Sequence, residues 1–236
     1  MLSKITNKII AVSIPVEQYL LTDIKIPREK LIRIENGIDS ILFSTNNKKI
    51  DLKDDTIIFI CVGRLEKEKN QMCVLLAAKE LIKEGYDFEI RIIGDGSQKE
   101  SLYSFCKNNN MLKQVRFLGY IPNKRLKEFY SDSDILILPS LRETFGLVLL
   151  EAMACYCPCI ASNVGGIPYI IRDGVNGYLF YSDDYKSLAK KMEFVINHKD
   201  IIPKLAQNAR NIVCRDFSVD KMVRRTEEVY IEELKR

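Results

Sequence analysis

The sequence predicts an α/β protein with a doubly wound parallel sheet and a helical C-terminal end. Short apolar runs alternate with helical patterns along most of the 236 residues, which is typical of strands joined by crossover helices. The runs are continuous rather than alternating between apolar and polar residues, as expected for strands that helices cover on both faces. From about residue 185 onward the pattern is wholly helical.

The strands and helices can be placed in order along the chain. We expect strands at 9–13, 31–34, 57–62, 88–93, 115–118, 135–138 and 157–161. Helices are expected at about 15–22, 68–84, 97–110, 123–131, 146–155 and 218–235. Pro122 suits the start of a helix, and Ser97 suits a helix cap. In such a sheet ligands bind beyond the carboxyl ends of the strands, so residues that follow strands are the candidates for a site.

The chain divides into three segments by composition and pattern. Residues 1–45 hold a single strand–helix unit that looks separate from the rest, and a polar stretch of linker character, "STNNKKIDLKDD", follows it. The main domain is assigned to 46–217, with its first strand beginning near Thr56. A closing helix occupies 218–236.

Composition excludes several classes of protein. The net charge is +4 with both signs interspersed, which gives no footprint of nucleic-acid binding. There is no run of about 18 apolar residues of the kind that predicts a membrane-spanning helix, and the N-terminus lacks the pattern of a signal peptide. The odd cysteine count of seven suits a reducing compartment. We expect a cytoplasmic protein, and a peripheral position at the inner membrane face is compatible with this.

The cysteine cluster and the single histidine are interpreted as structural. Cys155, Cys157 and Cys159 alternate, which is not the paired C-x-x-C spacing of zinc sites, so they are expected to be small buried residues. His198 is the only histidine and falls near a predicted helix end, where an exposed position is favoured over a general base.

A glycine turn could bind a nucleotide and an acidic pair could bind a metal, and each has a structural alternative. The turn at 94–96 reads Gly-Asp-Gly, which is an incomplete dinucleotide fingerprint, and a tight strand–helix turn is favoured. Asp132 and Asp134 resemble an acidic pair that holds a divalent metal. They also precede a strand, where aspartate commonly ends the preceding helix, and this second interpretation is favoured.

The loop after the strand at 57–62 carries candidate phosphate ligands. Gly63 permits close approach of the backbone, and Arg64 and Lys69 follow it in "CVGRLEKEKN". Arginine forks onto two phosphate oxygens, and lysine supplies a point charge. From this stretch alone, a charged surface loop is the favoured alternative.

The stretch "RETFGLVLLEAMA" places two carboxylates at the ends of an apolar segment. Seven uncharged residues separate Glu143 from Glu151. A helix is expected to open near Phe145 or Gly146, and the free amides at its N-terminus form an anion site. The glutamates can bind ligand hydroxyls, or Glu143 can cap the helix while Glu151 pairs with an arginine. The residues themselves leave these alternatives evenly matched.

An ordered set of motifs resembles the C-terminal domain of a family 4 glycosyltransferase, a Rossmann-like half of the two-domain GT-B architecture. The motifs are "IENGID", "VGRLEKEKN", "IIGDGSQKESL", "VRFLGYIP", "DILILPSLRETFGLVLLEAMA", "VGGIP" and "DGVNGYLF". The resemblance covers essentially the whole chain. An unrelated nucleotide-binding protein such as a dehydrogenase is disfavoured, because the glycine fingerprint is incomplete.

The resemblance implies retaining transfer of a sugar from a nucleotide diphosphate donor to a glycan or lipid-linked acceptor, with no metal or other cofactor. Glu143, Arg64 and Lys69 would be the catalytic residues: Arg64 and Lys69 neutralise the diphosphate, and Glu143 holds the sugar hydroxyls. Glu151 would hold the ribose. The remaining donor-binding positions implied are Gly63, the backbone near Tyr120 and Ile121 beside the base, and the amides near Phe145, Gly146 and Leu147.

Three departures from the family pattern bear on function. Tyr156 stands where glycine is usual, which implies an altered backbone or strain. Tyr169 stands where glutamate is common, which puts donor choice in doubt. The N-terminal acceptor domain has no counterpart, and 1–45 resembles its closing strand and helix. We therefore expect exposed apolar faces on the first and last helical segments, around Ile10, Val12, Leu20, Val223, Val229 and Tyr230. They would pair with each other, drive self-association or receive an acceptor-domain subunit, and without it the chain would be a catalytically incomplete binding module.

Overall fold

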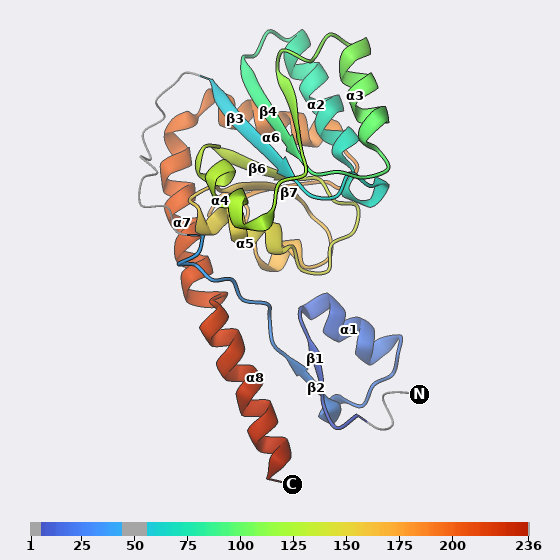
Figure 1. Cartoon of the computed structure of the whole chain (residues 1–236), viewed down its shortest axis with the longest axis vertical. Coiled ribbons are helices and arrows are strands. Elements are labelled where there is room, and N and C mark those ends of the chain that lie inside the picture. Colours follow the sequence, from blue (N-terminus) through green and yellow to red (C-terminus); the bar gives the residue numbers. More distant parts are fainter. Residues whose placement is uncertain (1–5, 44–55, 236) are drawn as a thin grey trace.

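The computed structural model describes residues 6–43 and 56–235, so the predicted boundary between residues 45 and 46 lies outside the described residues. Within the described part, the main domain is built on a parallel sheet of six strands in the order β5-β4-β3-β6-β7-β8 (Figure 1). The strands are β3 (Ile57–Val62), β4 (Phe88–Ile93), β5 (Val115–Gly119), β6 (Ile135–Leu138), β7 (Cys159–Ser162) and β8 (Gly177–Phe180). The predicted doubly wound parallel sheet is confirmed.

The order of the strands reverses between β3 and β6. The chain moves outward from β3 through β4 to β5, then returns to place β6 on the other side of β3 and continues to β7 and β8. Crossover connections leave the sheet in opposite directions at this point, and a crevice opens at the carboxyl ends of the two central strands. The loops that follow β3 and β6 therefore meet at this switch point.

Helices cover both faces of the sheet. One core lies against α2 (Gln71–Lys83), α3 (Lys99–Asn108) and α6 (Tyr185–Asn197); the other lies against α4 (Asn123–Ser131), α5 (Leu147–Ala154) and α7 (Ile202–Asp216). Neighbouring residues of β3 belong to different cores: Phe59 to the first and Ile60 to the second. Because successive side chains of a strand point to opposite faces, a strand covered on both faces must be apolar throughout.

Two helices on the first face begin later than predicted. Helix α2 follows Asn70, which adopts the left-handed conformation with φ 51° after the 3₁₀ turn η3 (Lys67–Lys69). The predicted cap of α3 at Ser97 is wrong, because the Ser97 hydroxyl donates to Glu66 instead, with 2.7 Å between Oγ and Oε2. The short 3₁₀ turns η4 (Ile167–Tyr169) and η5 (Lys199–Ile201) complete the connections.

The last two strands of the sheet depart from the prediction. Strand β7 begins two residues later than expected, because the chain first passes through Tyr156 in the left-handed conformation, with φ 58°. Strand β8 was not predicted, and it pairs in parallel with β7 along its length. Its four residues directly follow the turn at Asn176 and are too few to show a pattern.

The N-terminal unit, residues 6–33, is a small body separate from the main sheet (Figure 1). It contains β1 (Ile9–Ala11), α1 (Ile14–Thr22), the 3₁₀ turn η2 (Arg28–Lys30) and β2 (Leu31–Arg33). Strand β1 is shorter than predicted because Ser13 already caps α1, accepting from the Val16 amide at 3.3 Å. A two-stranded sheet is marginal by itself, so this unit depends on its surroundings for stability.

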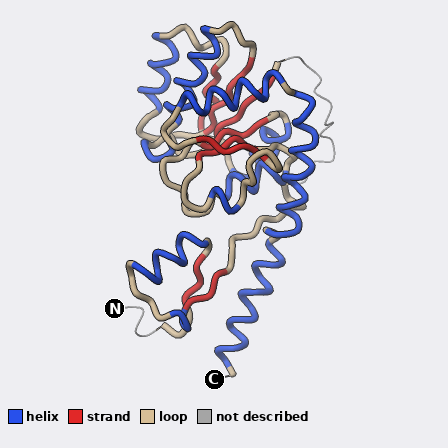
Figure 2. The backbone as a smooth tube through the Cα atoms, turned by 180° about the vertical axis from the view of Figure 1, so that it is seen from behind, coloured by secondary structure: helices blue, strands red, loops and turns tan. Residues whose placement is uncertain are grey.

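Helix α8 (Val219–Leu234) leaves the main domain and extends beside the N-terminal unit (Figures 1 and 2). The Ile38 amide donates to Phe217 O at 2.8 Å, and the Val219 amide donates to Ile38 O at 3.0 Å, so two crossing segments lie side by side. No described residue of α8 is buried, and Val223 and Tyr230 are exposed. No helix within the described ranges has the length and apolar character that a bilayer crossing requires.

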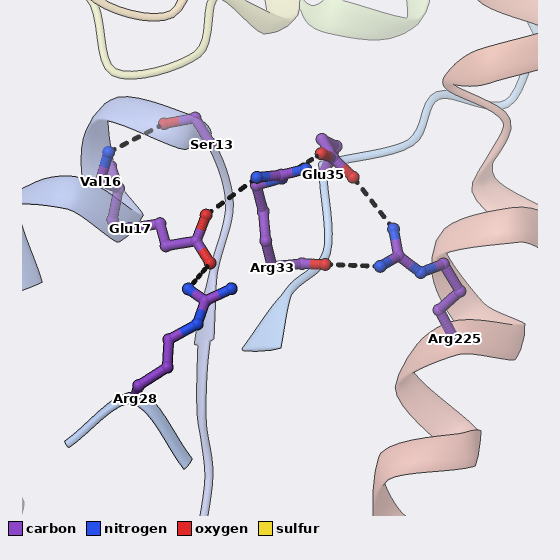
Figure 3. A network of polar contacts seen from close by, with 7 residues as sticks. All are labelled: Ser13, Val16, Glu17, Arg28, Arg33, Glu35 and Arg225. Carbon is purple, nitrogen blue, oxygen red and sulfur yellow. Dashed lines mark hydrogen bonds and ion pairs between the residues drawn. The ribbon is translucent and has the colours of Figure 1, made fainter. Parts of the chain in front are cut away.

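A chain of ion pairs joins the N-terminal unit to α8 (Figure 3). Glu17 is buried and accepts from Arg28 and from Arg33, whose Nη1 lies 2.9 Å from Glu17 Oε2. Arg33 Nε also lies 2.7 Å from Glu35 Oε1, and Arg225 of α8 donates to Glu35 Oε2 at 3.0 Å and to the Arg33 carbonyl at 2.6 Å. We call these five residues the arginine–glutamate chain.

Candidate functional site

A cleft of about 270 Å³ lies at the switch point, beyond the ends of β3 and β6. It is lined by six of the predicted site residues and by five others from the ends of β3 and β6, the start of α5, the loop before it and the segment after β2. The lining residues are Asn36, Val62, Gly63, Lys69, Leu138, Glu143, Thr144, Phe145, Gly146, Leu147 and Val148. The structure thus brings together predicted residues that are up to 84 positions apart in the sequence, from Gly63 to Leu147.

Lys69 and Glu143 form an ion pair across the cleft. Lys69 Nζ lies 2.8 Å from Glu143 Oε2, and only 21% and 13% of the two side chains are exposed. Ser140 Oγ contacts the same carboxylate oxygen at 3.3 Å. Lysine has three donors and the carboxylate about four acceptor positions, so both groups retain hydrogen-bonding capacity toward a ligand.

Arg64 lies differently from Lys69. Its side chain is 71% exposed, and Nη2 lies 2.6 Å from Oε1 of Glu68, four residues further along the chain. It is not part of the cleft lining. Its predicted role on the diphosphate stays a prediction, and it requires the guanidinium to leave Glu68.

The backbone of Glu143 is fixed by the glycine loop that follows β7. The Gly166 amide donates to Glu143 O at 2.9 Å. Gly165 has φ 52°, and a Cβ placed there would lie 1.9 Å from the same oxygen. A side chain at this position would push the two loops apart, so the glycine pair allows the loop after β7 to hold the loop after β6.

Helix α5 opens at the floor of the cleft, as predicted. Gly146 has φ 96°, a conformation that glycine adopts without strain, and α5 begins at Leu147. The first amides of a helix have no acceptor within it and carry partial positive charge, so they form an anion site. Phe145 is buried and packs edge-on against Phe217 at 6.0 Å between ring centroids.

Glu151 lies outside this cleft lining, between α5 and α4. Its Oε2 accepts from the Tyr130 hydroxyl and its Oε1 from the Asn123 amide, both at 2.9 Å. Burial raises the pKa of Glu151, and the two hydrogen bonds act in the opposite direction. Sequence reasoning missed Tyr130 and Asn123. The available signal was an aromatic hydroxyl on the apolar face of a helix, which needs a partner when buried.

The predicted base-binding segment lies at the end of β5. Tyr120 is 74% exposed, and Ile121 is half-buried. The Gly94 amide donates to Gly119 O at 2.8 Å, which ties the segment to the end of β4. Neither Tyr120 nor Ile121 lines the switch-point cleft, so their role beside the base stays a prediction.

The acidic pair and the glycine turn have structural partners. Asp134 Oδ2 accepts from the Ile58 amide at 2.8 Å, and Asp132 lies 2.6 Å from Arg91. In the Gly-Asp-Gly turn, Asp95 pairs with Lys99 at 3.0 Å. Across the described residues, no group of three or more His, Cys, Asp or Glu side chains is placed to hold a metal ion.

The cysteines and the histidine lie as predicted. Cys155, Cys157 and Cys159 are buried in the second core, and His198 is exposed at the end of α6. Burial raises the pKa of the Cys159 thiol well above its ordinary value. These thiols therefore behave as small apolar residues.

The two tyrosines that depart from the family pattern, Tyr156 and Tyr169, have different surroundings. Tyr156 is left-handed, and the guanidinium of Arg210 lies 4.8 Å from its ring centroid. Tyr169 ends η4 and is exposed. The strain predicted for a tyrosine at 156 is thus present in the backbone and is offset by a cation–π contact.

A switch-point cleft with a free helix N-terminus, a lysine and a carboxylate defines a Rossmann-like domain suited to a phosphate-bearing ligand. The sequence model of the family described as "Glycosyl transferases group 1" matches residues 43–212. The chain belongs to this family, and the resemblance that the motifs indicate is confirmed.

Similar proteins match most of the chain in sequence or in fold. The UDP-Gal:alpha-D-GlcNAc-diphosphoundecaprenol alpha-1,3-galactosyltransferase of Escherichia coli is 28% identical, covering 98% of this chain and 61% of that protein. A glycosyltransferase structure from Rickettsia africae has a TM-score of 0.87 and 25% identity, covering 99% of this chain and 67% of that one. The C-terminal domain of a glycosyl transferase group 1 family protein from Francisella tularensis has a TM-score of 0.68 and 29% identity, covering 78% of this chain and 100% of that domain.

The chain is shorter than its curated relatives. It spans between 55% and 61% of the length of the curated relatives that it matches first. The chain also matches the solved C-terminal domain of the Francisella tularensis protein along that domain's full length.

Proposed function

We propose that the chain is the donor-binding half of a retaining glycosyltransferase, which transfers a glycosyl group from a nucleotide diphosphate sugar to a glycan or lipid-linked acceptor. The observation that carries this proposal is the Lys69–Glu143 pair in front of the α5 N-terminus at the switch point. A cationic group and free amides suit a diphosphate, and a neighbouring carboxylate suits sugar hydroxyls.

The arrangement supports a division of labour in the reaction. Lys69 and the α5 amides offset the charge that develops on the diphosphate as its oxygen takes the electron pair of the breaking bond to the anomeric carbon. The acceptor oxygen forms the new bond on the same face of the sugar, and its proton passes to the released diphosphate. Both contacts of Glu143 fall on Oε2, which leaves Oε1 for sugar hydroxyls.

The acceptor side of the reaction rests on the relatives. The Escherichia coli relative is named for a diphosphoundecaprenol-linked acceptor, which supports a lipid-linked acceptor for this chain as well. Such an acceptor would draw the protein to a membrane surface. No metal is assigned a step, because the donor charge is met by Lys69 and backbone amides.

We also propose that the N-terminal unit and α8 contact an acceptor-binding domain, in the same polypeptide or in another. The shorter length relative to the family and the exposed Ile10, Val223, Tyr230 and Leu234 support this. The alternative partner is a second copy of this chain. Size-exclusion chromatography with light scattering tests the idea: a monomer that binds no apolar dye would contradict both.

A second candidate function is a binding module without turnover, which the donor-binding groups of the cleft support equally well. A thermal-shift panel of uridine, guanosine and adenosine diphosphates and their sugar nucleotides tests donor binding. Release of nucleoside diphosphate in the presence of acceptor tests turnover. Binding with release supports the enzyme, binding without release supports the module, and no shift with any nucleotide contradicts both.

A further inference from the structure

The glutamate on α5 is held by two donors from a single neighbouring helix. Tyr130 and Asn123 lie seven positions apart on α4, about two helical turns, and therefore on the same face. Side chains on a helix lean toward its N-terminus, so the long Tyr130 side chain reaches back in the direction of Asn123. The two donors meet opposite oxygens of one carboxylate, each at 2.9 Å.

The two donors differ in how firmly they are held. Tyr130 is 0% exposed and packed within the second core, so its hydroxyl has a fixed position. Asn123 is exposed at the first turn of α4. Two donors on two oxygens define the plane of the Glu151 carboxylate, which a single hydrogen bond does not.

A carboxylate held in this way still has room for a ligand. An ionised carboxylate has about four acceptor positions, and Tyr130 and Asn123 use two of them. Two vicinal hydroxyls match the two that remain. Tyrosine and asparagine both donate to Glu151, so their contacts favour the charged, accepting form over the protonated one.

We propose that Tyr130 and Asn123 are positioning residues that fix Glu151 for the nucleoside moiety of the donor. The inference rests on the proposed function, since it assumes that a nucleotide diphosphate binds at the switch point, and on the ribose contact that the family resemblance implies for Glu151. It predicts that loss of the Tyr130 hydroxyl weakens binding of the nucleoside moiety. Binding of the diphosphate, which Lys69 and the α5 amides contact, should not change.

The ionisation of Glu151 depends on the same two donors. Burial raises its pKa, and the hydrogen bonds from Tyr130 and Asn123 lower it. Tyr130 in turn faces Glu151 and the thiols of Cys155 and Cys157, and burial raises the pKa of its phenol well above the ordinary value. The phenol therefore stays protonated and remains a donor from pH 5 to 8. Loss of its hydroxyl should raise the pKa of Glu151 further.

The test is the affinity of Tyr130→Phe for uridine, guanosine or adenosine diphosphate, whichever binds the unaltered protein, measured by calorimetry from pH 5 to 8. Inorganic pyrophosphate is measured in parallel. We expect nucleotide affinity to fall about tenfold, the size of one hydrogen bond to a charged acceptor, while pyrophosphate affinity is unchanged. The pH below which nucleotide affinity declines should move upward.

Two further variants sharpen the test. Tyr86→Phe is the matched control, because the Tyr86 hydroxyl also donates to a glutamate, Glu193, at 2.9 Å, but on the opposite face of the sheet. It should leave the affinity for nucleotide unchanged. Asn123→Ala changes an exposed residue and should weaken nucleotide binding in the same selective way, which keeps the test valid if Tyr130→Phe folds poorly.

The outcomes separate this inference from the proposed function. Unchanged nucleotide affinity in both Tyr130→Phe and Asn123→Ala would overturn the positioning role alone. Equal losses for nucleotide and pyrophosphate would overturn it as well, because they indicate general disruption of the cleft. Failure of the unaltered protein to bind any of the three nucleotides would overturn the proposed function together with the inference.

Discussion

Lys69 Nζ lies 2.8 Å from Glu143 Oε2 and joins the loop after β3 to the loop after β6. The ion pair bridges the two loops where the strand order reverses. It places one positive and one negative group in the same cleft. The diphosphate of a ligand would bind Lys69 and the first amides of α5, and sugar hydroxyls would bind the Glu143 carboxylate. The predictions for these two residues are therefore different.

Replacing Lys69 should weaken binding of every diphosphate. In Lys69→Gln we expect nucleoside diphosphate affinity to fall about 10- to 100-fold, because a charge-assisted hydrogen bond to phosphate is lost. Lys67→Gln is the matched control, since Lys67 is an exposed lysine of the same 3₁₀ turn. Arg64→Gln should have a smaller effect, because Arg64 is paired with Glu68 outside the cleft. Calorimetry in low salt measures all three, and equal affinities in Lys69→Gln and Lys67→Gln would contradict the assignment.

Replacing Glu143 should separate the sugar from the nucleotide. Glu143→Gln removes a negative charge beside the diphosphate site, so we expect the nucleoside diphosphate to bind as well as before or better. The sugar nucleotide should bind about tenfold more weakly, because a charged acceptor for its hydroxyls is lost. The ratio of the two dissociation constants is the informative quantity. A parallel fall in both affinities would show that Glu143 does not contact the sugar.

The sequence was sufficient to predict five of the six strands of the main sheet and the members of the cleft that follow strands. Long apolar runs such as 57–62 and 135–138 are decisive because helices bury them on both faces. Gly63, Lys69 and Glu143 could be chosen because ligands in such sheets gather at carboxyl ends. For these three residues the local pattern left structural alternatives open, and the resemblance to the family decided between them.

What could not be predicted depends on packing between distant segments. Lys69 and Glu143 are 74 positions apart, and Tyr130 and Glu151 are 21 apart, so their partnerships follow from how loops and helices meet. Arg64 shows the converse, because a neighbour four positions away, Glu68, binds it and turns it from the cleft. Residue type and spacing do not decide between such competing partners.

Tyr156 should respond to substitution according to its backbone rather than its side chain. A non-glycine residue in the left-handed conformation costs about 1–2 kcal/mol, and the contact with Arg210 returns about 0.5–1 kcal/mol. Tyr156→Ala keeps the strain and loses the ring, whereas Tyr156→Gly loses both. We expect Tyr156→Gly to exceed Tyr156→Ala in free energy of unfolding by about 1 kcal/mol, measured in urea. Equal stabilities of the two variants would show that the backbone is not strained.

Arg225 should control the mobility of the N-terminal unit more than global stability. It is the α8 end of the arginine–glutamate chain, and its contacts with Glu35 and the Arg33 carbonyl are partly exposed. Partly exposed ion pairs contribute about 1 kcal/mol or less, so Arg225→Ala should change the unfolding midpoint little. Amide exchange in the segment 31–38 should become faster. Arg224→Ala, on an exposed neighbour in the same helix, is the control, and equal exchange in the two variants would contradict this role.

Acid should loosen the N-terminal unit through Glu17. Burial would raise the pKa of Glu17, but hydrogen bonds and charge from Arg28 and Arg33 prevail, and the pKa lies below its ordinary value of 4.5. A lowered pKa means that folding favours the carboxylate, so its stabilisation is complete above pH 4.5 and is lost as the pH falls through the lower value. Amide exchange of residues 9–33, corrected for the intrinsic pH dependence, should therefore accelerate below pH 4.5 while the strands of the main sheet stay protected. Glu17→Gln should exchange rapidly at all pH values, and Glu29→Gln, on an exposed residue, should follow the unaltered protein. If acid accelerated amide exchange equally in the main sheet and in the N-terminal unit, Glu17 would not be the pH-sensitive group. Its ion pairs with Arg28 and Arg33 lie within the N-terminal unit, so their loss should not open the main sheet.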